Sequence, residues 1–150
     1  MMMKLANNIK VKKLTETAKL PTQGSEYAAG WDLYSDGEYE IAPGGTVKIK
    51  TGLAFELPEG SFAGIFARSG LATKNGLRPA NCVGVCDSDY RGEYIVALHN
   101  DSNELQVIPH GTRVAQLIFL PYLPIKGFEI VEELNDTERG VGGFGSTGTN

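Results

Sequence analysis

Several kinds of protein are excluded by what this chain lacks. Its best apolar stretch, residues 114–120, is interrupted by Gln116 and falls far short of the roughly 20 apolar residues that span a bilayer. Residues 1–13 combine three Met with Asn and Lys but lack the apolar stretch of a signal peptide. We therefore expect no membrane segment and a cytoplasmic location.

Basic charge is also scarce. The chain has 14 Lys and Arg against 18 Asp and Glu, which gives a formal net charge of -4. A protein that holds nucleic acid on its surface needs many Lys and Arg side chains to neutralise phosphates. We therefore expect no nucleic-acid partner, although a single nucleotide needs only a local basic cluster.

Metal-ligating side chains are few. Cys82 and Cys86 are the only cysteines, and His99 and His110 are the only histidines. Their spacing matches no usual zinc pattern, so we do not expect a structural zinc site. We interpret the two cysteines as small buried residues on one face of a strand.

Helical periodicity is nearly absent, and short stretches of β character recur between Gly and Pro. In residues 47–50, Val and Ile alternate with Lys, as in a strand with one buried face. The length of 150 residues fits one domain with a core, and the spacing predicts an all-β sandwich or barrel. The predicted strands are residues 9–14, 45–51, 53–57, 62–67, 93–99, 105–108, 113–120 and 128–132. One helix is predicted over residues 70–74, with Ser69 as its N-cap and Gly76 at its left-handed end.

The last twelve residues, 139–150, carry nucleotide-binding groups in a segment that cannot fold alone. Five of them are glycines, and ordering such a backbone costs roughly 1–2 kcal/mol per residue. The Arg139 guanidinium suits a phosphate, the Phe144 ring suits a base, and Ser146 and Thr147 add hydroxyls. The segment is either a disordered terminus or an arm that a nucleotide orders.

Two internal segments combine turns with polar groups. In residues 67–72 a predicted strand meets a predicted helix, where unpaired N–H groups, Arg68 and Ser69 suit an anion. In residues 81–93 two strand-like arms surround an acidic turn that presents backbone groups to a flat base and Asp87 to a water. The alternatives are a capped turn with a surface Arg and a turn with solvated acids.

Two further segments place one polar residue among apolar ones. Gln116 interrupts the apolar part of residues 111–119 and needs a buried partner there. Asp32 lies between two aromatic residues in residues 29–35, although this segment also fits an ordinary core strand.

Together with the last twelve residues, these four segments resemble, in order and at compatible spacing, the five motifs of the trimeric dUTPase family. The resemblance covers about residues 5–148. It implies an all-β jelly-roll β-sandwich of the dUTPase-like or β-clip type over residues 1–136, with one short helix. A flexible glycine-rich arm, residues 137–150, would close over the active site. The five matching segments are residues 29–35, 67–72, 84–93, 111–119 and 139–148.

The resemblance also implies an activity and an assembly. Family members hydrolyse dUTP to dUMP and pyrophosphate with Mg²⁺, which keeps uracil out of DNA and supplies dUMP for dTMP synthesis. They form homotrimers whose active sites lie between subunits. One subunit gives the first, second and fourth motifs, another gives the hairpin of the third, and the third gives its arm.

Residue roles follow from the same resemblance. Asp87 is similar to the family's catalytic aspartate, which activates water for in-line attack on the α-phosphorus. Tyr90 resembles the Tyr that leaves no room for a ribose 2′-hydroxyl. We expect Mg²⁺ to bind mainly to triphosphate oxygens, with Asp32 acting on it through a bound water. The expected phosphate-binding residues are Arg68, Ser69, Gly70, Gln116, Arg139, Ser146 and Thr147. The expected uracil- and deoxyribose-binding residues are Asn81, Gly84, Val85, Cys86, Tyr90, Ile95 and Phe144.

One residue departs from the family pattern, and two other functions stay open. Cys86 stands where an aliphatic residue is usual, so we raise sensitivity of the site to thiol reagents as a hypothesis. The related dCTP deaminases share the fold, but the position of their catalytic Glu matches Ala97 here. A dUTPase with an added regulatory, protein-binding role is the second alternative, although no large insertion suggests a partner-binding module.

Overall fold

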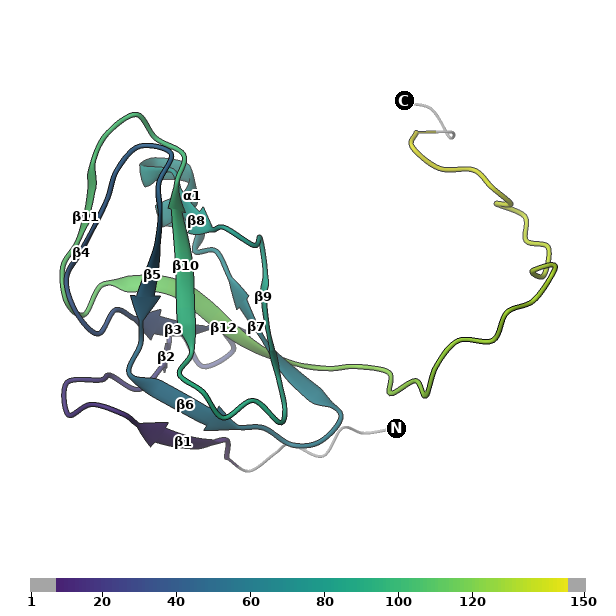
Figure 1. The fold of residues 1–150 in the computed structure, drawn as a ribbon, viewed down its shortest axis with the longest axis horizontal. Coiled ribbons are helices and arrows are strands. Elements are labelled where there is room, and N and C mark those ends of the chain that lie inside the picture. Colours follow the sequence, from purple (N-terminus) through teal and green to yellow (C-terminus); the bar gives the residue numbers. More distant parts are fainter. Residues whose placement is uncertain (1–7, 146–150) are drawn as a thin grey trace.

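The computed structural model describes residues 8–145, and its ordered elements are almost all β-strands (Figure 1). Within these residues, a single short helix, α1, covers Ser69–Asn75, and no helix is long and apolar enough to cross a membrane. The strands are β1 (Lys10–Lys13), β2 (Thr22–Gln23), β3 (Trp31–Tyr34), β4 (Tyr39–Ile41), β5 (Thr46–Lys50), β6 (Leu53–Glu56), β7 (Ser61–Phe66), β8 (Leu77–Pro79), β9 (Gly84–Asp87), β10 (Ile95–Asn100), β11 (Gln106–Ile108) and β12 (Arg113–Pro121).

The strands form antiparallel sheets that enclose one core. The largest sheet has the order β2-β3-β12-β7-β9, and a second has the order β5-β10-β8. The pairs β1-β6 and β11-β4 extend the structure at its sides. This arrangement, together with the likeness to solved structures given below, confirms the predicted all-β jelly-roll fold.

Alternation of side chains explains why these segments form strands. In β10, Val96 and Leu98 are almost fully buried, whereas the alternating residues Ile95, Ala97 and His99 are more exposed. In β5, Ile49 is buried between two exposed Lys side chains. Each fully buried aliphatic side chain stabilises the fold by roughly 1.5–3 kcal/mol, so one face of each sheet is drawn into the core.

The helix confirms one predicted end and corrects the other. Gly76 has φ 66°, and its N–H donates to the Leu71 carbonyl, as expected for a left-handed end. Ser69 is not the N-cap, because helical backbone already begins there and Arg68 takes the capping position without a side-chain hydrogen bond. The Ser69 carbonyl instead accepts a hydrogen bond from Thr73 Oγ1 at 2.7 Å.

Two other predictions about local structure are wrong. Residues 128–132 form no strand, and Phe128 and Ile130 are 93% and 98% exposed, because the described residues offer them no neighbouring strand. Cys82 does not share a strand with Cys86, since it is exposed, precedes β9 and has a left-handed φ of 62°.

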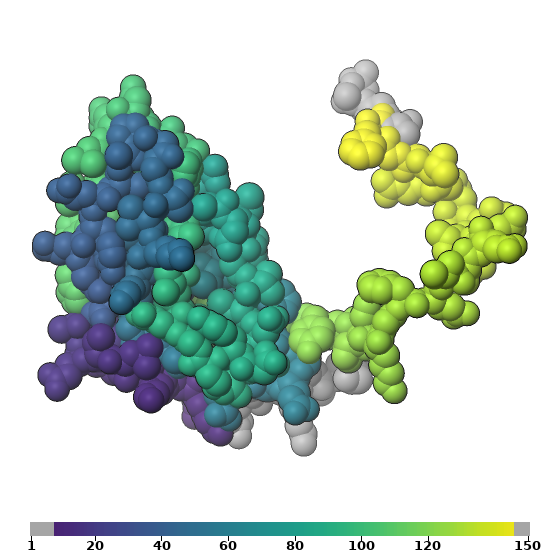
Figure 2. All heavy atoms as spheres, viewed as in Figure 1, coloured from purple at the N-terminus to yellow at the C-terminus, as the bar shows by residue number. Residues whose placement is uncertain are grey.

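Beyond β12 the chain leaves the body. The Tyr122 N–H donates to the Gly60 carbonyl at 3.1 Å, and from residue 123 the chain runs outward as an extended, exposed segment. We call residues 123–145 the arm. Figure 2 shows the arm standing clear of the rest of the molecule.

Candidate active site

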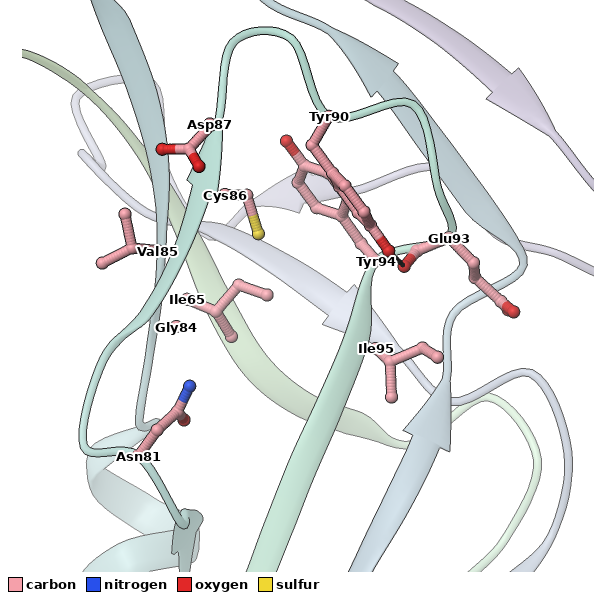
Figure 3. Close-up of a pocket in the computed structure, with 10 residues that line it drawn as sticks. All are labelled: Ile65, Asn81, Gly84, Val85, Cys86, Asp87, Tyr90, Glu93, Tyr94 and Ile95. Atoms are coloured by element: carbon pink, nitrogen blue, oxygen red, sulfur yellow. Dashed lines mark hydrogen bonds between the residues drawn. The ribbon is translucent and has the colours of Figure 1, made fainter.

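A pocket of about 250 Å³ opens between the two sides of the hairpin formed by β9, the turn at residues 88–92 and the start of β10 (Figure 3). Ile65 and Tyr94, which the sequence did not point to, contribute to its lining, as does Glu93, which ends the matching segment but had no predicted role. The pocket also brings together the predicted catalytic and nucleoside-binding residues Asn81, Gly84, Val85, Cys86, Asp87, Tyr90 and Ile95.

The backbone of β9 is positioned by close contact with β7. Gly84 is paired with Ile65, and a Cβ added at Gly84 would lie 3.1 Å from the Ile65 Cβ. Glycine therefore lets β9 lie tightly against its neighbour. Among the described residues, β9 is the outer strand of its sheet, so the N–H and C=O groups on its other edge face the pocket. Such an edge can hydrogen-bond a flat, polar ligand.

Asp87 ends β9 with an exposed carboxylate. Among the residues that the structure describes, no Lys, Arg or His lies within ion-pair distance of it. The following turn is closed by the Tyr90 N–H, which donates to the Asp87 carbonyl at 3.2 Å. The carboxylate can therefore accept a proton from a water without first breaking an ion pair.

Tyr90 is held across the turn. Its hydroxyl donates to the Glu93 carbonyl at 3.1 Å, and its ring packs on that of Tyr94. A Cβ at Gly92 would overlap the Tyr90 hydroxyl, so glycine is needed for this position of the ring. The turn thus presents one face of Tyr90 to the pocket.

The side of the pocket nearest the core carries a thiol and a phenol that stay neutral at ordinary pH. Burial raises the pKa of Cys86 to about 11, and the nearby Asp87 charge acts in the same direction. Burial also raises the pKa of Tyr94 well above its usual value. Because the thiolate is the reactive form, the high pKa of Cys86 weighs against the proposed sensitivity to thiol reagents.

Of the predicted phosphate-binding residues, those on β12 and around the start of α1 lie elsewhere, near Asp32 on β3. Arg68 Nε donates to Asp32 Oδ1 at 2.8 Å, and Arg113 Nη1 lies 3.4 Å from Asp32 Oδ2. The Asp32 side chain is 15% exposed, so both interactions are partly shielded from water. Two guanidinium groups around one carboxylate leave a net positive charge, which favours an anion. Arg113 was missed because only the pairing of β12 with β3 brings it to Asp32.

Gln116 and the start of α1 complete this cluster. Gln116 is paired with Asp32 across β12 and β3, and its Nε2 donates to the Ala67 carbonyl at 2.9 Å. This is the partner that its place in an apolar strand required. A Cβ at Gly30 would overlap the Gln116 side chain, which explains that glycine. Ser69 and Gly70 lie exposed in the first turn of α1.

The metal prediction can be compared with the oxygen donors available. Within residues 8–145, no three His, Cys, Asp or Glu side chains are grouped so as to hold a metal ion. Mg²⁺ is often bound by one or two carboxylates together with substrate phosphates and water, and Asp32 and Asp87 are suitable carboxylates of this kind. The donor set therefore fits an ion carried by a triphosphate.

The Asp87 carboxylate and the phosphate cluster lie beside opposite ends of β7, while the pocket itself extends along β7 as far as Ile65. Asp87 is paired with Phe62 near the start of β7, whereas Gln116 is paired with Phe66 at its end, and Arg68 follows two residues later. At about 3.3 Å per residue, Phe62 and Phe66 are roughly 13 Å apart. Within one chain, Asp87 is therefore separated along β7 from the cluster around Asp32.

The arm reaches neither cluster within this chain. Arg139 Nε donates to the Gly142 carbonyl at 2.8 Å, and the Phe144 ring is fully exposed. The predicted residues Ser146 and Thr147 lie outside the described part of the chain.

Comparison with known proteins gives a consistent result. The dUTPase family model matches residues 16–148. A curated deoxyuridine 5′-triphosphate nucleotidohydrolase from Desulfitobacterium hafniense is 52% identical over 149 residues, which cover 95% of this chain and 98% of the relative. The enzyme of that name from Candida glabrata is 43% identical over 142 residues, with 95% and 97% covered.

Solved structures agree. The dUTPase of Staphylococcus bacteriophage 80alpha with dUpNHpp is 27% identical, has a TM-score of 0.85, and is matched over 95% of this chain and 99% of its own. A mutant dUTPase of phage phi11 of S. aureus, described with a structural Mg(II) ion, is 25% identical with a TM-score of 0.76, and 85% of this chain and 98% of that one are covered. The family match over most of the chain, the curated relatives and the shared fold lead to one conclusion: this chain belongs to the dUTPase family.

Proposed function

We propose that this protein is a Mg²⁺-dependent dUTP diphosphatase of the cytoplasm that hydrolyses dUTP to dUMP and pyrophosphate. One observation carries the proposal. A single pocket combines an unpaired carboxylate, Asp87, with the free edge of β9 and the ring of Tyr90. These are the groups needed to activate a water, pair with a base and limit the size of a sugar.

The base and sugar are selected on the two sides of the hairpin. The edge of β9 pairs with uracil, and cytosine is disfavoured because its exocyclic amine meets a backbone donor. The Tyr90 ring, fixed by the Glu93 carbonyl, fills the space that a ribose 2′-hydroxyl needs. Asn81 and Ile95 line the same pocket.

Asp87 acts as the general base. Its carboxylate holds a water and takes a proton from it as the water oxygen attacks the α-phosphorus. The bond from the α-phosphorus to the oxygen shared with the β-phosphate breaks, and that oxygen leaves with pyrophosphate. dUMP keeps the new oxygen from water.

The triphosphate is held by the cluster around Asp32. Asp32 orients Arg68, while Ser69, Gly70 and Gln116 add donors nearby. Mg²⁺, when bound to the triphosphate, neutralises charge that builds up on the phosphate oxygens, and Asp32 acts on it through a water. The arm and residues 146–150 that follow it close with Arg139, Ser146 and Thr147 on the phosphates and Phe144 on the base, and so exclude water.

A homotrimer completes the site. The separation of Asp87 from the Asp32 cluster along β7 supports an assembly in which a second chain brings its Asp87 to this phosphate cluster. The arm exposes a set of large apolar side chains that a neighbouring chain would cover, namely Leu123, Ile125, Phe128, Ile130 and Leu134. Three chains then share three active sites, each with an arm from the third chain.

The activity is tested by incubating the protein with Mg²⁺ and, separately, dUTP, dCTP, dTTP, dATP, dGTP and UTP, while pyrophosphate and ammonia are measured. We expect pyrophosphate from dUTP alone. Ammonia from dCTP would identify a deaminase instead, and pyrophosphate from every nucleotide would show that the pocket does not select uracil.

Mixing two inactive variants tests the shared site. Asp87→Asn damages the hairpin contribution, and deletion of residues 139–150 damages the arm contribution. In the proposed trimer, every mixed assembly contains one site with an intact Asp87 and an intact arm. We expect activity to appear when the two variants are unfolded, mixed and refolded together, but not when they are refolded apart. No recovery in trimers shown to contain both chains would contradict the shared site.

A further inference from the structure

Tyr90 has little support of its own. It lies on the turn of the hairpin, is 45% exposed, and is fixed at its hydroxyl end by one hydrogen bond to the Glu93 carbonyl. A ring in this position can swing outward unless something lies behind it. The position of Tyr90 therefore depends on what its ring packs against.

Tyr94 is the residue behind it. The two ring centroids are 6.1 Å apart with an interplanar angle of 28°, and Tyr94 in turn packs on Phe55 with centroids 4.5 Å apart. Phe55 and Tyr94 are 4% and 1% exposed. The three rings form a continuous column from the core to the pocket, and Figure 3 shows the rings of Tyr90 and Tyr94 lying against each other.

Tyr94 is fixed independently of the turn. Its N–H donates to the Leu53 carbonyl at 2.8 Å, and its carbonyl accepts a hydrogen bond from Thr51 Oγ1 at 2.6 Å. Beside it, Glu93 Oε1 accepts a hydrogen bond from the Gly52 N–H at 2.8 Å. These bonds attach Tyr94 to the segment between β5 and β6, so its ring forms a rigid surface for Tyr90.

The ring of Tyr94, rather than its hydroxyl, makes these contacts. The hydroxyl is buried and has no hydrogen-bond partner among the described residues; burial, and after it the nearby Cys86 thiol, raise the pKa of Tyr94. A buried hydroxyl without a partner adds no bonding energy. Loss of the hydroxyl should therefore leave the aromatic column intact, whereas loss of the ring should not.

We infer that Tyr94 is a positioning residue for sugar selection, which holds the Tyr90 ring in the place where it excludes a ribose 2′-hydroxyl. The inference rests on the proposed function, because Tyr90 acts on the sugar only if a nucleotide binds in this pocket. Although Tyr94 lines the pocket, it is only 1% exposed, so in this role it acts through Tyr90 rather than on the substrate. Stacked aromatic pairs contribute enough to change an equilibrium roughly two- to tenfold, so the effect should be measurable.

The test compares Tyr94→Phe with Tyr94→Leu. For each variant, kcat and KM are measured with dUTP and with UTP, and thermal unfolding is followed. In Tyr94→Leu we expect the ratio of kcat/KM for dUTP over UTP to fall about tenfold. In Tyr94→Phe we expect the ratio to stay within about twofold of the wild type, with no loss of thermal stability.

A matched control separates position from stability. Phe119→Leu removes another ring that packs on the core but does not line the pocket, and it should lower stability without changing the dUTP to UTP ratio. If Tyr94→Leu does not fold, Tyr94→Met fills the space with a flexible apolar chain and repeats the test.

Three results would overturn the inference. The first is an unchanged preference for dUTP over UTP in folded Tyr94→Leu or Tyr94→Met. The second is loss of that preference in Tyr94→Phe. The third is failure of both Tyr94→Leu and Tyr94→Met to fold while Phe119→Leu folds. A wild-type protein that does not hydrolyse dUTP would instead overturn the proposed function, so the two failures are distinguishable.

Discussion

The hairpin pocket and the arm contribute to the same proposed reaction but are stabilised in opposite ways. The hairpin is bonded to β7 on one side and to the segment between β5 and β6 on the other, and an aromatic column supports it from the core. The arm, over residues 123–145, has local hydrogen bonds such as Gly140 N–H to the Thr137 carbonyl and exposes most of its side chains.

The difference indicates a division of labour. Selection of a base and placement of a reacting water need a geometry that exists before the substrate arrives. Closure over a triphosphate needs a segment that can first let the substrate in. A region with few buried contacts is the least costly to rearrange, and the arm is such a region.

The largest expected effect comes from the preformed region. Asp87→Asn keeps the shape of the side chain but removes the base, so we expect turnover to fall roughly 10²- to 10⁴-fold while the triphosphate still binds. Single-turnover rates and equilibrium binding of a non-hydrolysable dUTP analogue check this. Loss of nucleotide binding together with turnover would contradict this prediction, because Asp87 would then have a structural role rather than act only in the chemical step.

Deletion of residues 139–150 tests the arm in the way that Asp87→Asn tests the hairpin. We expect a drop in kcat/KM for dUTP of about 10²-fold, because closure and its phosphate contacts are lost. The midpoint of thermal unfolding should stay within about 1 °C of that of the full chain, since residues 139–145, the described part of the deletion, bury almost no apolar surface. A large fall in thermal stability would show that the arm supports the fold as well.

A pair of glycine substitutions tests the contrast within the folded chain. In Gly92→Ala the new Cβ overlaps the Tyr90 hydroxyl, so the ring shifts and loses its bond to the Glu93 carbonyl. We expect about 1 kcal/mol less stability and about a tenfold rise in KM for dUTP. In Gly143→Ala the new Cβ meets nothing within 4 Å, and chemical denaturation should give unchanged stability. Equal stability of the two variants would mean that the hairpin is as adaptable as the arm.

The smallest effect concerns thiol chemistry. Cys86 is a neutral thiol below its pKa of about 11, so its alkylation should be slow near pH 7.5 and rise about tenfold per pH unit up to that value. Mass spectrometry of a Cys82→Ser background measures this rate without the exposed Cys82. Deletion of the arm should not change the rate in the free protein. Rapid alkylation at neutral pH would show that the hairpin opens.

A raised pKa also sets the direction of a stability effect. The folded state favours the neutral Cys86 thiol over a range in which the unfolded thiol, with a pKa of about 9, already ionises. This contribution is present below about pH 9 and is lost as the pH rises towards 11. Cys86→Ser should therefore remove the part of the stability loss between about pH 9 and 11 that comes from ionisation of this thiol.

Much of the fold followed from alternation and turns, because burial of one strand face leaves a period of two in the sequence. Residues 128–132 show the limit of this argument. Their composition suits a strand, but a strand also needs a neighbour, and a sequence pattern does not say which chain provides it. The prediction that Cys82 lies on a strand was wrong for another reason. Its left-handed backbone belongs to the turn between β8 and β9.

The site was predictable where chemistry and local spacing coincide. The hairpin residues around Asp87 lie within one short segment, and the structure places them in one pocket. Arg113 meets Asp32 only through the pairing of two distant strands, which include an irregular register between Arg113 and Ala115. Tyr94 had no signal at all, because a buried aromatic residue looks like ordinary core until its stacking on Tyr90 is seen.

The separation of Asp87 from the Asp32 cluster along β7 has a consequence for dilution. In the proposed trimer a folded chain on its own has no complete site, so catalysis follows the population of assembled chains rather than of folded ones. Once trimers begin to dissociate, activity per chain should fall with up to the square of the total chain concentration. In that proposed assembly, the placement of Asp87 and the Asp32 cluster along one β-strand makes enzyme output depend on how much of the protein a cell contains.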